Sequence, residues 1–194
     1  MDALWLRGGL PESLLAKNDA TSLGVSAPAV ARYVDLLVDL LLVRRLRAWS
    51  GNLGKRLVRA PKTYVRDSGL LHALLELETR HELLGHPVAG PSWEGFAVEN
   101  LVAVAGERRV PYFYRTEDGS EIDLVFERGG RVELAIEIKR TTAPDISKGF
   151  RLGCTALRPR AAYLLHSGTE EWPVREGVTA ISLKGLMKRL SETA

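Results

Sequence analysis

Hydrophobic positions in the first third of the chain recur with the spacing of a helix. From Val30 to Leu41 they fall at every third or fourth residue, which predicts one long amphipathic helix. Ser26 is placed to cap its N-terminus, and Pro28 suits a first helical turn. The residues at 23–26 predict the turn of a helix-turn-helix, in which this helix follows the turn.

The pattern changes after this helix. Val43–Trp49 and Lys62–Arg66 are predicted as two strands, joined by Ser50–Pro61, a loop that contains glycine. A helix-turn-helix followed by a hairpin is the arrangement of a winged helix.

The second half of the chain begins with a helical pattern and continues mainly with strands. The expected elements are, in order, a helix at 93–105, strands at 111–115, 121–127 and 131–140, a helix at 146–154, a strand at 160–165 and a closing helix at 183–190. The pairs Asp118-Gly119 and Gly129-Gly130 mark tight turns between the first three strands. A meander that leads into a crossover predicts a three-layer α/β unit.

These patterns divide the chain into four parts. They are an N-terminal remnant segment at 1–19, a winged helix-turn-helix at 20–67, a helical connector at 68–89 and an α/β unit at 90–194. In the connector, Asp67 or Ser68 is placed to cap a helix at 69–78. A second short helix is expected at 80–84, and the proline and glycine residues at 86–91 mark the last boundary.

Composition places the chain among ordinary soluble globular proteins. It has 194 residues, of which 45% are hydrophobic and 26% charged, enough to bury a core. Cys154 is its one cysteine, so no internal disulfide forms and the reducing cytoplasm is the expected location. The longest apolar stretch, at 36–43, is far too short to cross a bilayer, and no signal peptide or membrane partner is expected.

One carboxylate lies on the apolar side of the helix predicted at 93–105. Glu94 shares a face with Val98 and Leu101 when residues are counted at about 100° each, whereas Glu99 points away. A buried carboxylate needs a partner or a metal ion, because an unpaired buried charge is costly. The alternative is a partly exposed glutamate at the helix start, where the helix dipole favours it.

Two of the predicted strands also separate their side chains by face. In the strand at 121–127, strict alternation places Ile122 on the opposite face from Asp123 and Val125. In the strand at 131–140 it separates an apolar row from a charged one. The apolar row is Val132, Leu134, Ile136 and Ile138, and the other is Glu133, Ala135, Glu137 and Lys139. A solvated strand face also carries such a Glu-x-Lys pattern, so the pair gains meaning only within a larger set.

That larger set suits phosphodiester hydrolysis. The candidate catalytic residues are Glu94, Asp123, Glu137 and Lys139. Clustered carboxylates bind Mg²⁺ or Mn²⁺ through oxygen, with Asp123 and Glu137 expected as ligands and Glu94 as a further ligand or a base behind the metal. Lys139 is expected to act on the nucleophilic water or to offset charge in the transition state.

The order of these residues resembles a known motif series. Gly90-x-x-x-Glu94, then Asp123, then Glu137-Ile138-Lys139 resemble the motifs of PD-(D/E)XK nucleases, especially archaeal Holliday-junction resolvases. The resemblance covers roughly Gly90–Leu190. It implies a nuclease-like αβββαβ core and a Mg²⁺-dependent endodeoxyribonuclease site.

A closer resemblance spans nearly the whole chain. The segments that carry it are Leu6-Arg7-Gly8-Gly9-Leu10-Pro11-Glu12, Lys55-Arg56-Leu57-Val58-Arg59-Ala60-Pro61-Lys62, Tyr64-x-x-Asp67-x-Gly69-Leu70, Trp93-Glu94 and Tyr114-Arg115-Thr116. They resemble the C-terminal part of a prokaryotic AAA-type ATPase family that carries the nuclease-like domain of unknown function 4143. That family has a longer helical stretch before its helix-turn-helix, so the resemblance implies a truncated or internally deleted member.

The ATPase motor itself is not expected here. No Gly-x-x-x-x-Gly-Lys-[Ser/Thr] sequence occurs, and Gly51-Asn52-Leu53-Gly54-Lys55-Arg56 is too short and ends wrongly for a phosphate-binding loop. We therefore expect no ATP site in this chain.

Basic residues cluster over the predicted hairpin without an acidic residue between them. They are Arg44, Arg45, Arg47, Lys55, Arg56, Arg59, Lys62 and Arg66. Such clusters bind phosphates by releasing counterions, and Trp49 and Tyr64 are placed to stack on bases. The alternative is a solvated hairpin kept soluble by charge. Asp35 and Asp39 make the preceding helix a poor groove reader, so the hairpin is the expected DNA contact.

Three functions remain open from the sequence. The first is a metal-dependent DNA-acting nuclease whose winged helix holds the substrate. The second is a non-catalytic DNA-binding or regulatory module, and the third is the accessory end of an AAA-type ATP-binding protein. The intact set of four candidate residues favours the first, and a homo-oligomer is compatible with each.

Overall fold

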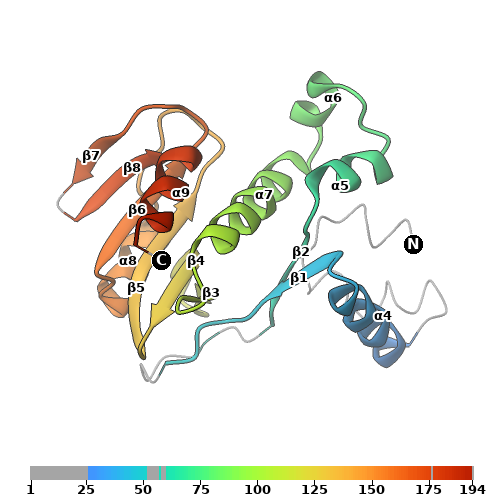
Figure 1. Ribbon diagram of the computed structural model, residues 1–194, viewed down its shortest axis with the longest axis horizontal. Helices are drawn as coiled ribbons and strands as arrows, with labels where there is room; N and C mark the ends of the chain where they lie inside the picture. The colour runs from blue at the N-terminus through green and yellow to red at the C-terminus, as the bar shows by residue number, and fades with distance from the viewer. Residues whose placement is uncertain (1–25, 52–56, 58–59, 176, 194) are drawn as a thin grey trace. The chain divides into compact units, whose positions relative to one another are not determined.

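The computed structural model describes residues 26–51, 57, 60–175 and 177–193 (Figure 1). Within them the chain forms six helices and eight strands and divides into two compact units. The first unit contains the described residues up to Leu46 together with Ala60–Phe96. The second contains the described residues of 47–59 together with Ala97–Thr193. The fold is therefore mixed α/β, as the sequence predicts.

The first unit holds a long helix, a short antiparallel hairpin and two short helices. They are α4 (Ala27–Asp39), β1 (Val43–Leu46), β2 (Lys62–Val65), α5 (Ser68–Leu74), α6 (Arg80–Gly85) and the first half of α7 (Ala89–Val104). The helix, the strands and the two connector helices follow the predicted order, with ends that differ by a few residues. The remnant segment predicted at 1–19 and the start of the predicted turn at 23–25 lie outside the described residues.

Local capping explains where two of these helices begin. Ser26 Oγ accepts a hydrogen bond from the backbone N–H of Ala29 at 3.4 Å, and a proline stands in the first turn, as predicted. Asp67 Oδ1 accepts from the N–H of Leu70 at 2.8 Å. Of the two predicted caps for α5, Asp67 is thus the one that is used.

The second unit is built on one six-stranded sheet. Its elements are β3 (Val110–Arg115), β4 (Glu121–Arg128), β5 (Arg131–Ile138), α8 (Lys148–Leu157), β6 (Ala161–His166), β7 (Trp172–Arg175), β8 (Val178–Ser182) and α9 (Leu183–Ser191). The strand order is β3-β4-β5-β6-β8-β7, in which β5, β6 and β8 are parallel and the other pairings antiparallel. Neither β7 nor β8 is predicted from the sequence. β7 has only four residues, one of them a proline, which is tolerated here because β7 is an edge strand.

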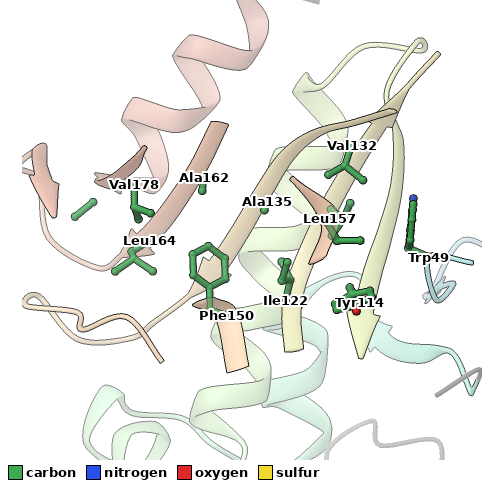
Figure 2. Packing of buried hydrophobic residues seen from close by; sticks show 12 residues of the cluster. Trp49, Tyr114, Ile122, Val132, Ala135, Phe150, Leu157, Ala162, Leu164 and Val178 are labelled. Carbon is green, nitrogen blue, oxygen red and sulfur yellow. The ribbon is translucent and has the colours of Figure 1, made fainter. Parts of the chain in front are cut away.

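Helices cover both faces of this sheet. α8 packs against β4 and β5 on one face, and α9 packs against β6 and β8 on the other (Figure 1). Under α8, Phe150 and Leu157 contact a buried cluster that includes Ala135 and Leu164 (Figure 2). Within the described residues, no helix is long and apolar enough to cross a membrane.

A β-bulge on β4 changes which residues face α8. Between Tyr112 and Tyr114 the partner on β4 moves from Val125 to Ile122, so β4 carries one extra residue there. Ile122 consequently joins Val125 in the cluster under α8 (Figure 2). The strict alternation predicted for this strand, which separates these two residues, is wrong at the bulge.

A second bulge has the same effect on β5. Phe126 pairs with Leu134 but Glu127 pairs with Val132, so β5 carries the extra residue. Val132 therefore packs in the same cluster as Ala135. The apolar and charged rows predicted for β5 do not hold at its start.

Helix α7 begins earlier than predicted. It starts at Ala89, so Gly90 and Pro91 lie inside its first turn instead of forming a break. A proline is tolerated there, because the first N–H groups of a helix have no partner within it.

The described residues of 47–59 belong to the second unit and include the end of the first predicted strand and part of the loop predicted at 50–61. Ala48 forms a bridge with Phe113, and Leu57 forms one with Thr116. Trp49, predicted to stack on bases, is 9% exposed, and its indole N–H donates to Glu127 at 2.7 Å. The described part of this segment therefore lies along the edge strand β3, and Trp49 is a packing residue.

Candidate functional site

Three residues of the predicted catalytic set come together where β4 begins and β5 ends. Asp123 and Glu137 lie on these adjacent antiparallel strands. Asp123 Oδ2 accepts a hydrogen bond from the backbone N–H of Ile138 at 2.9 Å. Lys139 Nζ lies 2.7 Å from Glu137 Oε1, so the lysine and the glutamate form an ion pair.

The carboxylate of Glu137 is only partly satisfied. The residue is 5% exposed, and its Oε2 atom has no hydrogen-bond partner in the described structure. A buried carboxylate oxygen without a donor is costly. The position therefore favours binding of a cation or of a polar ligand.

The donor set fits a hard divalent ion. Mg²⁺ prefers oxygen ligands and often takes only one or two protein carboxylates, with waters and a substrate phosphate completing its coordination. Asp123 and Glu137 supply two such carboxylates. Among the residues that the structure describes, no group of three or more His, Cys, Asp or Glu side chains could hold a metal ion. Any centre here relies on the substrate or solvent for its other ligands.

The charges around Lys139 favour its protonated form. Burial alone lowers the pKa of the Lys139 ammonium, but the hydrogen bond and charge of Glu137 outweigh it. The charges of Asp123 and Glu121 add to this effect, so the pKa is raised above its usual value. Lys139 is thus a cation at neutral pH, suited to balancing negative charge.

Cys154 on α8 is affected by the same carboxylate. Burial, the larger cause, and the charge of Glu137 raise the pKa of the Cys154 thiol to about 11, although Arg175 opposes the shift. The thiol is therefore neutral at physiological pH, as expected of a packing residue that takes no part in nucleophilic chemistry.

Glu94 is bonded by two side chains of β2, within the first unit. Its Oε1 atom accepts hydrogen bonds from Lys62 Nζ at 2.8 Å and from Tyr64 Oη at 2.6 Å. Both partners are buried. Gly95 allows the ring of Tyr64 to approach, because a Cβ there would lie 3.1 Å from Tyr64 Cδ1. The partner that the sequence analysis requires for Glu94 is thus a lysine and a tyrosine of the hairpin.

The basic residues predicted to bind nucleic acid have different surroundings. Three of them lie outside the described residues: Lys55, Arg56 and Arg59. Lys62 is 7% exposed against Glu94, which favours a structural role over phosphate contact. Arg45 bonds to Asp35 at 2.7 Å. The remaining three are Arg44 and Arg66, which are half-buried and have partners, and Arg47, which is exposed.

Arg109, a buried arginine in the loop between α7 and β3, is not among the residues that the sequence predicts for a site. Its guanidinium donates to both carboxylate oxygens of Glu133, at 3.0 and 3.2 Å. It also donates to the carbonyls of Ala105, Leu190 and Thr193. Arg109 thereby joins the C-terminal ends of α7 and α9 to the sheet. Its sequence neighbour Arg108 is exposed, so residue type alone gives no signal for this role.

Comparison with known protein families assigns the second half of the chain. Residues 89–186, about half of the chain, match a family model described as Domain of unknown function (DUF4143). The chain belongs to the DUF4143 family. This confirms the family part of the resemblance seen in the sequence. Residues 20–81 of this DUF4143 protein match a second model, described as Domain of unknown function (DUF8612).

Relatives of this DUF4143 protein occur in mycobacteria. Two uncharacterized proteins, from Mycobacterium bovis and Mycobacterium tuberculosis, are each 34% identical to it over 231 residues. The alignment covers 93% of this chain and 52% of each relative, so the chain spans about half the length of these relatives. Because 93% of 194 residues is about 180, the relatives carry about 50 residues that this chain lacks within the aligned region. No solved structure gives a significant match.

Proposed function

We propose that the second unit is a metal-dependent nuclease-type domain that hydrolyses phosphodiester bonds in DNA. The observation that carries the proposal is the buried carboxylate of Glu137, which pairs with Lys139 through one oxygen while its other oxygen has no partner among the described residues. Asp123 lies on the adjacent strand. Two carboxylates and an ammonium group are the side chains that such a reaction uses.

The roles follow from the position of each group. Asp123 and Glu137 would hold Mg²⁺ or Mn²⁺, which supplies charge neutralisation at the phosphate and a more acidic water. The side chain of Lys139 is 37% exposed, so its ammonium can contact a phosphate that approaches from solvent. There it would balance the charge that develops during hydrolysis.

Glu94, the fourth predicted member, enters the proposal differently. Its Oε1 atom is occupied by Lys62 and Tyr64. The proposed centre therefore rests on Asp123 and Glu137 and does not require Glu94.

A cleavage assay tests the proposal. Branched, linear and single-stranded DNA are incubated with the full chain and Mg²⁺ or Mn²⁺, and products are resolved on denaturing gels. We expect metal-dependent products, and a loss of turnover of about 100-fold or more in Lys139→Ala and in Glu137→Gln. Lys184→Ala, an exposed lysine on α9, serves as the control and should cleave normally. Absence of cleavage by the wild-type chain with both metals, or full cleavage by Lys139→Ala, overturns the proposal.

A non-catalytic DNA-binding or regulatory module is the second candidate, for instance the C-terminal part of an AAA-type ATP-binding protein that lacks its ATPase domain. The observation that favours it is that two predicted metal ligands are already paired with cations, Glu137 with Lys139 and Glu94 with Lys62. Calorimetric titration with Mg²⁺ and Mn²⁺ separates the two candidates. DNA binding without metal binding or cleavage selects the module.

A further inference from the structure

Arginines gather at one end of the six-stranded sheet. The register of β5, β6 and β8 places the first residues of these parallel strands at the same end. Arg128 and Arg131 pair with each other across the turn that leads into β5. Arg160 immediately precedes β6, and Arg175 pairs with the first residue of β8. Glu137 and Lys139 lie at the opposite end of the sheet, where β5 ends.

Arg128 is half-buried, and the other three are exposed. A fifth arginine, Arg158 at the end of α8, is also exposed. The structure gives none of the five an ion pair or a side-chain hydrogen bond with another described residue. The acidic residues nearby are engaged: Glu127 accepts from Trp49 and Glu133 is bonded by Arg109. Glu107, in the loop before β3, is an exposed acidic residue at this end. Among the described residues of this surface, positive charge therefore exceeds negative charge.

The electrostatics of Glu133 show that the arginines act together. The hydrogen bond from Arg109 is the main cause that lowers the pKa of the Glu133 carboxyl, and the charges of Arg128 and Arg160 lower it further. The charges of Arg128, at the end of β4, and of Arg160, before β6, thus both act on this carboxylate. Arg158 stands in the left-handed region (φ 48°), where glycine is favoured, so an arginine occupies a strained position at this end.

An open cavity of about 430 Å³ lies between Arg160 and Arg175. This volume falls within the range of roughly 300–1,000 Å³ that is usual for small-molecule sites. Its apolar lining comes from Ala161, Ala162, Pro173 and Val178. Tyr163 and Thr179 also line it. The residues that line the cavity therefore combine two arginines with apolar side chains.

We infer that this end of the sheet binds a phosphate-bearing nucleotide unit of a nucleic-acid strand. Arg160 and Arg175 contact the phosphate, because the guanidinium fork matches phosphate oxygens. The sugar and base contact the apolar residues of the lining. The remaining arginines, Arg128, Arg131 and Arg158, extend the positive surface beyond the cavity to neighbouring phosphates, which favours a strand over a free nucleotide. The inference deepens the proposed function and takes its biological meaning from it, but binding can be measured without hydrolysis.

Fluorescence anisotropy with a labelled thymidine oligonucleotide tests the inference, with the full chain in EDTA so that no metal-dependent cleavage occurs. The double variant Arg160→Ser/Arg175→Ser should weaken binding about tenfold or more and reduce the slope of log affinity against log salt by about 1 to 2. The variant Arg160→Lys/Arg175→Lys keeps the charge and should lose less affinity. Both arginines are exposed, so none of these changes opens the core.

The matched control is Arg151→Ser/Lys184→Ser. It removes the same charge from exposed positions near the starts of α8 and α9, which begin at the other end of the sheet. This control should bind within about twofold of wild type. An equal loss in the control, or no loss in Arg160→Ser/Arg175→Ser, overturns the inference.

Competition with free thymidine monophosphate separates a strand from a nucleotide. Displacement of the oligonucleotide only at much higher nucleotide concentration supports strand binding, and displacement at equal concentration overturns it in favour of a free nucleotide. The outcome is independent of the nuclease proposal. If the chain does not cleave DNA but its binding depends on Arg160 and Arg175, only the proposed function is overturned. If the chain cleaves DNA but Arg160→Ser/Arg175→Ser binds as tightly as wild type, only this inference is overturned.

Discussion

Burial and neighbouring charge set the chemistry of single residues in the second unit. Glu137 is almost fully buried, and its negative charge reaches both Lys139 and Cys154. It favours the charged form of the lysine and the neutral form of the thiol. One carboxylate therefore raises the pKa of both neighbours and favours the protonated form of each, because it stabilises a nearby cation and destabilises a nearby anion.

The first prediction concerns the thiol of Cys154. Its pKa is raised from 9.0 to about 11, so the native thiol should react slowly with iodoacetamide at about pH 8 and faster as the pH approaches 11. In denaturant the same rise should occur around pH 9, because burial and the charge of Glu137 are removed. Rate against pH, followed by mass spectrometry, gives both profiles. A native profile that coincides with the denatured one contradicts the prediction. The variant Glu137→Gln lacks the negative charge near the thiol, so its native profile should move to lower pH.

Contacts between elements depend on a few buried ion pairs. In the first unit, Lys62 and Tyr64 of β2 hold Glu94 of α7. In the second, Arg109 joins α7, α9 and β5. Breaking a buried pair is expensive, since the charge left behind loses both water and its partner. Both arrangements should therefore contribute more to stability than the exposed pairs of this protein.

A double-mutant cycle measures the joint between β2 and α7. The side chains of Lys62 and Glu94 are 9% and 25% exposed, so Lys62→Met and Glu94→Gln should each lower the free energy of unfolding by about 2–4 kcal/mol. The double variant should cost less than the sum of the two, by about 1 kcal/mol or more. Urea unfolding of the full chain gives the values. The control is the exposed pair Arg45 and Asp35, whose coupling should be about 0–1 kcal/mol. Additive losses at Lys62 and Glu94 would show that the pair contributes nothing.

The removal of Arg109 should destabilise the second unit. Arg109→Met removes the donor to the part-buried carboxylate of Glu133 and one donor each to the carbonyls of Leu190 and Thr193, which should cost about 3 kcal/mol in urea unfolding. The exposed neighbour provides a control, as Arg108→Met should change stability by no more than about 0.5 kcal/mol. Similar losses in the two variants contradict the assigned role.

The stability difference between wild type and Arg109→Met should also depend on pH. Arg109 is the main cause that holds the pKa of Glu133 below 4.5, so the contribution of this carboxylate is present above pH 4.5. It is lost as the pH falls through the lowered pKa of the folded state. Unfolding curves recorded from neutral to acidic pH should therefore converge for the two proteins at low pH. A difference that grows on acidification has the wrong sign for this pairing.

The whole molecule offers a test of metal binding that does not use activity. If Asp123 and Glu137 bind Mg²⁺ only in the folded state, the ion should stabilise the chain by about 2.7 kcal/mol at 100 times its Kd. Differential scanning fluorimetry with Mg²⁺ and with EDTA measures the effect. Glu137→Gln should lose it, whereas Lys139→Ala should keep it, because Lys139 is not a ligand. An equal shift in wild type and Glu137→Gln places the ion elsewhere.

Local features of the chain are visible in the sequence by itself. Ser26 and Asp67 are recognised as helix caps, because a cap depends only on a side chain and the backbone three residues ahead. The Gly129-Gly130 turn is recognised because glycine readily adopts positive φ, which both residues have in the structure. The order of helix, three strands, helix and strand follows from periodicity, and the family resemblance follows from the motifs. The catalytic role of Asp123, Glu137 and Lys139 stays a prediction, although the structure brings these residues together.

Only the tertiary structure decided which distant residues meet. The bulges that bring Ile122 and Val132 under α8 depend on the register of three strands, and strict alternation within one strand contains no such information. The partner of Glu94 lies 30 or more residues away on β2. The arginines at the start of β6 and the end of β7 are separated in sequence and meet because parallel strands begin at the same end of a sheet. Short-range patterns report the period of each element, whereas sites require the topology that places those elements side by side.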